Sequence, residues 1–125
     1  WIDHIYTKLK NNESLVIYNA PYNHVVHACD IYGIIRQIST IRYYKNDVFN
    51  VCASGITTSQ DIVEFMKNKL SSQSSLEIRE QGNAVAHVIS NKKLLSIYNP
   101  MDVKDSLALY LKEMSSGEKD KDENG

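Results

Sequence analysis

The sequence is poor in the features on which catalytic sites depend, and its charges nearly cancel. It contains two cysteines, two prolines and five glycines in 125 residues, with a formal net charge of −1. The glycines stand singly, so neither a phosphate-binding loop nor a dinucleotide fingerprint is present. No serine lies in a Gly-x-Ser-x-Gly elbow, and the acids form no convincing acid–base pair. We therefore expect a protein that is not an enzyme and that binds no cofactor.

The sparse cysteines and the short apolar runs indicate where the protein works. Cys29 and Cys52 lie inside apolar segments rather than in a spaced framework, which is typical of buried free thiols in a reducing compartment. No apolar run approaches the roughly 20 residues that a membrane span needs, and no signal peptide is visible. We expect an intracellular protein of the cytoplasm or nucleus, without membrane contact. Because the chain begins at Trp1 without a methionine, we also expect a fragment or a processed product.

Histidines suggest a metal site that the rest of the chain does not complete. His24 and His27 stand three residues apart on a predicted helix, with Cys29 and Asp30 close behind. A zinc site needs three or four ligands, and no second cluster supplies the remainder. The sequence therefore predicts no metal, and histidines on a helix surface or in a core explain the pattern better.

Composition and length predict one globular domain. Hydrophobic residues make up 42% of the chain and charged residues 23%, as in ordinary globular proteins. The last nine residues carry four acids and two lysines, which leaves 12 basic and 11 acidic groups in residues 1–116. We expect a single α+β domain over residues 1–114 and a disordered acidic tail over residues 115–125.

Hydrophobic periodicity predicts the order of the elements. The expected helices cover residues 2–10, 21–38 and 58–70, with a last helix after Pro100 that buries Val103, Leu107, Leu111 and Met114. The expected strands cover residues 13–20, parts of 40–54 about a break at 45–47, a hairpin of 76–80 with 84–90, and 94–98. Together they predict a mixed four- to five-stranded sheet with two helices on one face and short terminal helices.

The helix predicted over residues 21–38 is apolar on an unusually wide arc. Its apolar residues form two stripes, Val25, Ala28, Cys29, Tyr32 and Ile35 on one and Ile31, Ile34 and Ile38 on the other. Asn23, His27, Asp30 and Gln37 mark a narrow polar face. A surface helix normally has one stripe, so we expect burial against the sheet and against a second helix or protein chain. We assign Ile31, Ile34 and Ile38 to an interface.

The segment from Val48 to Leu70 predicts a buried strand, a glycine turn and a capped helix. Gly55 supplies the turn, and Thr58 with Asp61 three residues later resembles a capping box. Backbone N–H groups at such a helix start attract anions, phosphate included. Ser54, Gly55, Thr57 and Thr58 are therefore candidate phosphate contacts.

Basic and aromatic residues alternate just before that segment. Arg36, Arg42 and Lys45 interleave with Tyr43 and Tyr44, and Lys92 and Lys93 lie on a predicted turn. Tyrosines can stack on unpaired bases while the cations hold phosphates, a combination suited to single-stranded RNA. The alternative is an ordinary strand with one tyrosine in the core and the other on the surface.

Residues 14–37 have the pattern of a strand, a proline loop and a helix, and VFNVCASGITTSQDIVEFMKN has that of a strand, a glycine turn and a helix. Both segments resemble units of the Alba superfamily of small nucleic-acid-binding proteins. LEIREQ and NAVAHVIS look like its closing strands, so the resemblance covers about residues 14–90. It implies an Alba-like sheet and pairing with a second subunit, as in relatives from ribonuclease P-type particles. The basic residues that the family usually carries in the first loop and around the glycine are replaced here by Tyr18, Asn19, Ala20, Tyr22, Cys52, Ala53 and Ser54.

These observations support two hypotheses for the function. The first is a non-catalytic nucleic-acid-binding module, for RNA rather than DNA, that works as a homodimer or with a paired Alba-like subunit. The second is a protein-interaction or scaffold subunit without nucleic-acid contact, because the chain combines excess apolar helix surface with almost no net charge.

Overall fold

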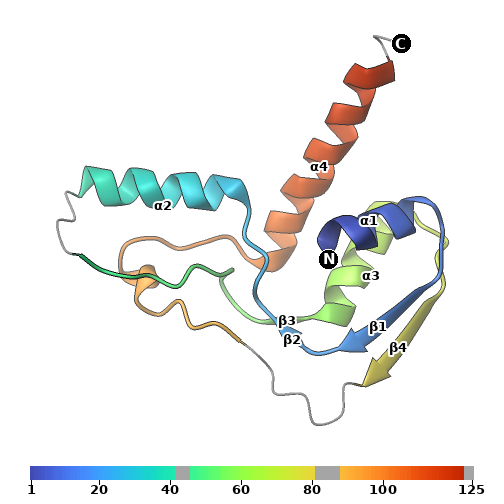
Figure 1. Cartoon of the computed structure of the whole chain (residues 1–125), viewed down its shortest axis with the longest axis horizontal. Helices are drawn as coiled ribbons and strands as arrows, with labels where there is room; N and C mark the ends of the chain where they lie inside the picture. Colours follow the sequence, from blue (N-terminus) through green and yellow to red (C-terminus); the bar gives the residue numbers. More distant parts are fainter. Residues whose placement is uncertain (42–45, 81–87, 123–125) are drawn as a thin grey trace. The chain divides into compact units, whose positions relative to one another are not determined.

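A computed structural model describes residues 1–41, 46–80 and 88–122 of the chain (Figure 1). Within these ranges the protein is α+β, with four α-helices and short strands that form two two-stranded sheets. It divides into two compact units. The first unit comprises Trp1–Tyr22 and Ile56–Val88, and the second comprises Asn23–Gly55 and Ile89–Gly125.

The first unit holds both sheets. Its elements are α1 (Ile2–Lys10), β1 (Leu15–Asn19), β2 (Pro21–Tyr22), β3 (Thr57–Thr58), α3 (Ser59–Lys69) and β4 (Leu76–Glu80). Strands β1 and β4 pair in parallel, with Leu15 opposite Leu76, whereas β2 and β3 pair antiparallel. The helices predicted over 2–10 and 58–70 and the strands predicted over 13–20 and 76–80 are confirmed.

One face of the β1–β4 sheet is covered by α1 and α3, which lie together in Figure 1. Leu15 and Ile17 of β1 are buried, while Val16 and Tyr18 between them are exposed, as alternation along a half-buried strand requires. The helices complete this core with side chains that are almost fully buried, namely Ile5, Leu9, Ile62, Val63 and Met66. Each such side chain contributes about 1.5–3 kcal/mol relative to solvent exposure, so this cluster holds the unit together.

The second unit is mainly helical. Its elements are α2 (Ala28–Thr40), a short 3₁₀ helix η1 (Leu94–Ser96) and α4 (Val103–Asp122). The predicted apolar face of the last helix is confirmed for Val103, Leu107 and Leu111, which are buried. Helix α4 continues past Met114 to Asp122. The disorder predicted for residues 115–125 and the single domain predicted over 1–114 stay predictions.

The second helix begins later than expected. Pro21 belongs to β2, where it lies opposite Thr58, and α2 begins at Ala28. His27 caps the helix, because its Nδ1 accepts a hydrogen bond from the backbone N–H of Cys29 at 3.2 Å. Pairing with β3 thus overrides the preference of proline for a first helical turn, and the prediction of a helix from residue 21 was wrong.

The β-rich segment predicted over residues 40–54 is not a strand in its described part. Residues 46–53 form no ladder, and Ser54 makes an isolated bridge to Asp102. Side-chain amides satisfy carbonyls of this segment, since Asn91 Nδ2 donates to the carbonyl oxygens of Cys52 and Ala53 at 3.4 Å. Tertiary contacts with side chains therefore replace the predicted sheet pairing.

The predicted closing strands also differ. The strand at 76–80 pairs with β1 rather than in a hairpin with residues 84–90, of which 88–90 form no strand and 84–87 lie outside the described residues. The segment 94–98 begins with η1 instead of a strand. The described residues consequently contain two two-stranded sheets and no four- to five-stranded one.

The start of α3 carries the predicted capping box. Thr58 Oγ1 accepts a hydrogen bond from Asp61 N–H at 3.0 Å, and Asp61 Oδ2 accepts one from Thr58 N–H at 3.3 Å. Two of the helix's unpaired donors are thereby satisfied within the chain. This arrangement fixes the point at which α3 leaves β3.

We expect Thr58→Ala to lower the free energy of unfolding by about 1 kcal/mol, because it removes the hydroxyl that caps α3. Chemical denaturation followed by far-UV circular dichroism measures the change. Thr7→Ala on α1 is the matched control, since the Thr7 hydroxyl donates to Asp3 O within its own helix and caps no helix start. Equal effects of the two substitutions would contradict a stabilising cap at Thr58.

Candidate interaction surface

A buried carboxylate holds one side of α2 against the rest of the second unit. Asp30 is almost fully buried, and its two oxygens accept hydrogen bonds from Tyr98 Oη–H at 2.9 Å and from Met101 N–H at 3.1 Å. A buried carboxylate without partners would cost several kcal/mol, so these two donors are required. The assignment of Asp30 to a polar, solvent-exposed face was therefore wrong.

Asn23, expected on the same polar face, is buried as well. Its side-chain Nδ2 donates to Ile89 O at 2.8 Å, and its Oδ1 accepts from Ile89 N–H at 3.1 Å. The amide thus binds both backbone groups of one residue, as a strand neighbour would. Burial is tolerated because both polar ends of the side chain have partners.

The ring of Tyr98 lies directly against the backbone of α2 at Gly33. A Cβ atom added to Gly33 would lie 2.5 Å from Tyr98 Oη and 2.7 Å from Cε2. Only glycine permits this approach without moving the ring. The hydrogen bond to Asp30, followed by burial, raises the pKa of Tyr98 above its ordinary value of 10.0.

The opposite side of α2 is an exposed apolar face. Tyr32 is 69% exposed, Ile35 60% and Ile31 43%. Ala28, Tyr32 and Ile35 follow at intervals of four and three residues, so they lie on one side of the helix, away from Asp30 and Ile34. We call Ala28, Ile31, Tyr32 and Ile35 the α2 face.

The residues predicted for the interface separate in the structure. Ile31 lies on the exposed α2 face, Ile34 is buried in the second unit and Ile38 is half-buried. Tyr32 and Ile35 were not assigned to the interface, although their stripe was visible in the sequence. Helical periodicity could not show which of the two stripes the unit would bury.

The α2 face carries very little charge. The helix contains two charged residues, Asp30, which is buried, and Arg36, which is exposed beside the face. At the start of the helix, Nε2 of His27 lies 3.2 Å from Oε2 of Glu113 on α4. The α2 face is thus an apolar patch with one cation at its edge.

Three of the four predicted phosphate contacts at the glycine turn, Ser54, Thr57 and Thr58, make hydrogen bonds within the chain. Gly55 adopts a positive φ of 74°, as the turn requires, and Ser54 N–H donates to Met101 O at 3.0 Å. At the helix start, Asp61 Oδ2 lies 2.8 Å from Thr58 Oγ1 and 3.4 Å from Thr57 Oγ1. A carboxylate therefore already occupies the position where an anion would benefit from the helix dipole, and it would repel phosphate.

Among the described residues, the basic residues predicted to bind nucleic acid are not shown to gather in one cluster. Lys93 Nζ pairs with Asp47, donates to Val48 O at 3.1 Å and lies 5.0 Å from the centre of the Phe49 ring. Lys92 is exposed, and Arg36 lies on α2. Arg42, Tyr43, Tyr44 and Lys45 lie outside the described residues.

The sequence predicted no metal site and two buried free cysteines. Within residues 1–41, 46–80 and 88–122, no three His, Cys, Asp or Glu side chains gather as metal ligands would. Both cysteines are free thiols, but Cys29 is exposed, so its predicted burial was wrong. Burial raises the pKa of the Cys52 thiol, which makes it a poor nucleophile.

No protein-family model matches the sequence, and no curated protein matches it. None of the described helices is both long enough and apolar enough to cross a membrane.

We expect Tyr98→Phe to destabilise the protein by about 1–3 kcal/mol at neutral pH, because a buried oxygen of Asp30 loses its donor. The folded-state pKa of Tyr98 is raised, so its stabilising contribution is complete below pH 10 and is lost as pH rises through the folded pKa. The difference between the two proteins should therefore shrink above pH 10. Urea denaturation at several pH values between 7 and 11 measures it, with Tyr32→Phe on the exposed α2 face as the control. A difference that stays constant to pH 11 would contradict the role given to the hydrogen bond.

Proposed function

We propose that this chain is a non-catalytic protein-association module that pairs with a second copy of itself through the α2 face. The observation that carries the proposal is the exposure of three large apolar side chains on one side of α2, Ile31, Tyr32 and Ile35. The opposite side of the helix is fixed by the hydrogen bonds of Asp30, so a modest rotation cannot bury these side chains. An apolar patch on a regular element is a common mark of a protein interface.

A second copy of the chain suits the α2 face because the face carries almost no charge and so does not repel itself. A two-fold interface places each patch against the same patch, which requires that the patch does not repel itself. The α2 face contains no acid, and in an antiparallel helix pair centred between Tyr32 and Ile35, each Arg36 meets an uncharged part of the partner helix. Tyr32 would then pack against Ile35 of the partner. The resemblance to the Alba superfamily, whose members pair with a second subunit, adds support.

The expected affinity is modest because the face is small. A helix of 13 residues is about 20 Å long, and the face is one side of it. Stable interfaces bury about 800 Å² on each partner, and smaller ones are transient. We therefore expect a dimer with a dissociation constant of about 1 μM or higher. This corresponds to a binding free energy of about −8 kcal/mol or weaker.

The nucleic-acid hypothesis draws less support from the described residues and stays a prediction. The helix start proposed for phosphate is capped by Asp61, and Lys93 is engaged with Asp47. Nucleic-acid affinity depends on clustered cations, and here the body of the chain is almost neutral. Binding to single-stranded RNA at two salt concentrations belongs beside the association experiment, because a steep salt dependence would favour this function instead.

Ile35→Glu should convert the dimer to a monomer, because a buried carboxylate would face an apolar patch without a partner. Sedimentation velocity over a hundredfold range of protein concentration measures the equilibrium. The matched control is Leu95→Glu, which places the same charge on an exposed apolar residue of η1 in the same unit. Far-UV circular dichroism should remain that of the wild type, since the Ile35 side chain is largely exposed.

Two outcomes would overturn the proposal. The wild-type chain could sediment as a monomer at every concentration, or Ile35→Glu could dimerise as well as Leu95→Glu does. Replacing Ile34 would be no test of the interface, because that side chain is buried and a charge there would unfold the unit.

A further inference from the structure

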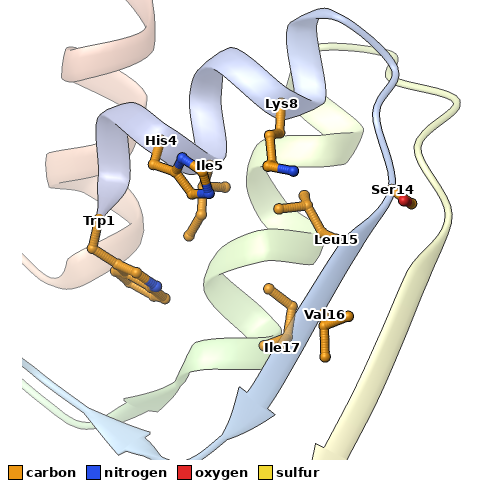
Figure 2. A pocket seen from close by; sticks show the side chains of 8 residues that line it. All are labelled: Trp1, His4, Ile5, Lys8, Ser14, Leu15, Val16 and Ile17. Atoms are coloured by element: carbon orange, nitrogen blue, oxygen red, sulfur yellow. The ribbon is translucent and has the colours of Figure 1, made fainter.

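The first unit contains a groove between α1 and β1 that the association surface does not use. Its volume is about 380 Å³, at the lower end of the range for ligand pockets. Figure 2 shows that its side chains come from Trp1 at the start of α1, from α1, from the loop that follows it and from β1. The lining residues are Trp1, His4, Ile5, Lys8, Ser14, Leu15, Val16 and Ile17.

The floor of the groove is an open strand edge. Among the described residues β1 pairs with β4 and with no other strand. Leu15 N–H donates to Ser75 O at 3.0 Å, so the backbone groups of Leu15 point toward β4. Successive residues of a strand direct these groups to opposite edges, so those of Val16 point to the edge away from β4, and Val16 is one of the residues that line the groove.

A contact at the next outward-facing residue marks where the open edge ends. Tyr18 O accepts a hydrogen bond from Ser59 Oγ–H at 2.7 Å, on the edge of β1 that faces away from β4. Ser59 N–H in turn donates to Ala20 O at 2.9 Å. The edge is thus closed by the start of α3 from Tyr18 O onward and is available at Val16.

The walls of the groove favour an anionic segment with apolar side chains. Trp1 is 51% exposed and packs against Tyr22 with a ring-centre distance of 5.0 Å, which gives the groove an aromatic end. Lys8 and His4 lie on the α1 wall, and none of the lining residues is acidic. Glu13 lies 3.5 Å from Lys8, but an exposed ion pair of this kind contributes at most about 1 kcal/mol and is readily exchanged for another carboxylate.

We propose that this groove binds an extended, acidic peptide segment, which adds to the open edge of β1 as a further strand. The backbone N–H and C=O of Val16 pair with the peptide backbone. An acidic side chain of the peptide lies near Lys8 and His4, and an apolar one lies against Trp1. Strand addition of this kind draws affinity from main-chain hydrogen bonds and specificity from alternate side chains.

The tryptophan of the groove provides the readout, because it is the single tryptophan of the chain. The probe is a blocked hexapeptide, acetyl-Val-Thr-Val-Glu-Val-Thr-amide, titrated into the whole chain. We expect a saturable change in tryptophan emission with a dissociation constant of about 10–100 μM. The same peptide with lysine in place of glutamate should bind at least about tenfold more weakly.

N-methylated peptides separate strand addition from other binding. Methyl groups on one set of alternate backbone nitrogens block the hydrogen bonds to β1, while those on the other set face away from it. One methylated peptide should therefore lose binding and the other should keep it. Equal affinities for the two would overturn the proposal, as would the absence of any saturable emission change up to millimolar peptide.

Val16→Pro tests the protein side of the same contact. Proline removes the N–H that points into the groove, and an edge position tolerates it because no ladder hydrogen bond to β4 is lost. Binding of the hexapeptide should fall by about tenfold or more, whereas Arg79→Gln on β4 should leave it unchanged. If Val16→Pro fails to fold, the two methylated peptides with the wild-type chain decide the question. A folded Val16→Pro protein with unchanged affinity would rule out pairing at this edge.

Discussion

The placement of α2 depends on one buried carboxylate. Asp30 lies in the first turn of the helix, where the helix dipole favours a negative charge, and it receives one donor from a tyrosine side chain and one from the backbone. Because a buried charge tolerates no loss of partners, these hydrogen bonds determine which side of α2 faces the unit. The same constraint directs Tyr32 and Ile35 outward. The apolar surface of the second unit is thus a consequence of a polar contact.

The start of α3 illustrates how a local charge changes what a helix terminus can bind. The N–H groups there would attract phosphate if they were free. Asp61 instead accepts from the Thr58 N–H and hydroxyl, and its carboxylate satisfies the helix dipole from within. A capping box and an anion site compete for the same donors. This competition is the physical reason for favouring protein association over phosphate contact at this point.

The contacts proposed for the two units depend on different interactions, apolar packing in one and backbone hydrogen bonds in the other. The α2 face offers apolar side chains without backbone groups, so it suits a rigid partner of complementary shape, such as the same face of another copy. The edge of β1 offers backbone donors and acceptors beside a mixed wall, which suits an extended segment. Both proposals are consistent with a module that joins proteins. The described sheets are smaller than the Alba resemblance implies, so the pairing proposal depends on the α2 face rather than on that resemblance.

Sequence alone determined the elements whose signals are local. Periodicity located α1, α3 and the first half of α4, and the Thr58–Asp61 spacing identified the cap, because helix formation and capping depend on residues three or four apart. Tertiary structure decided the pairing of β1 with β4, the late start of α2 at Ala28 and the burial of Asp30 and Asn23. It also decided which stripe of α2 is exposed. These features depend on partners distant in the chain, such as Tyr98 for Asp30 and Thr58 for Pro21, and no local pattern records which distant groups will meet.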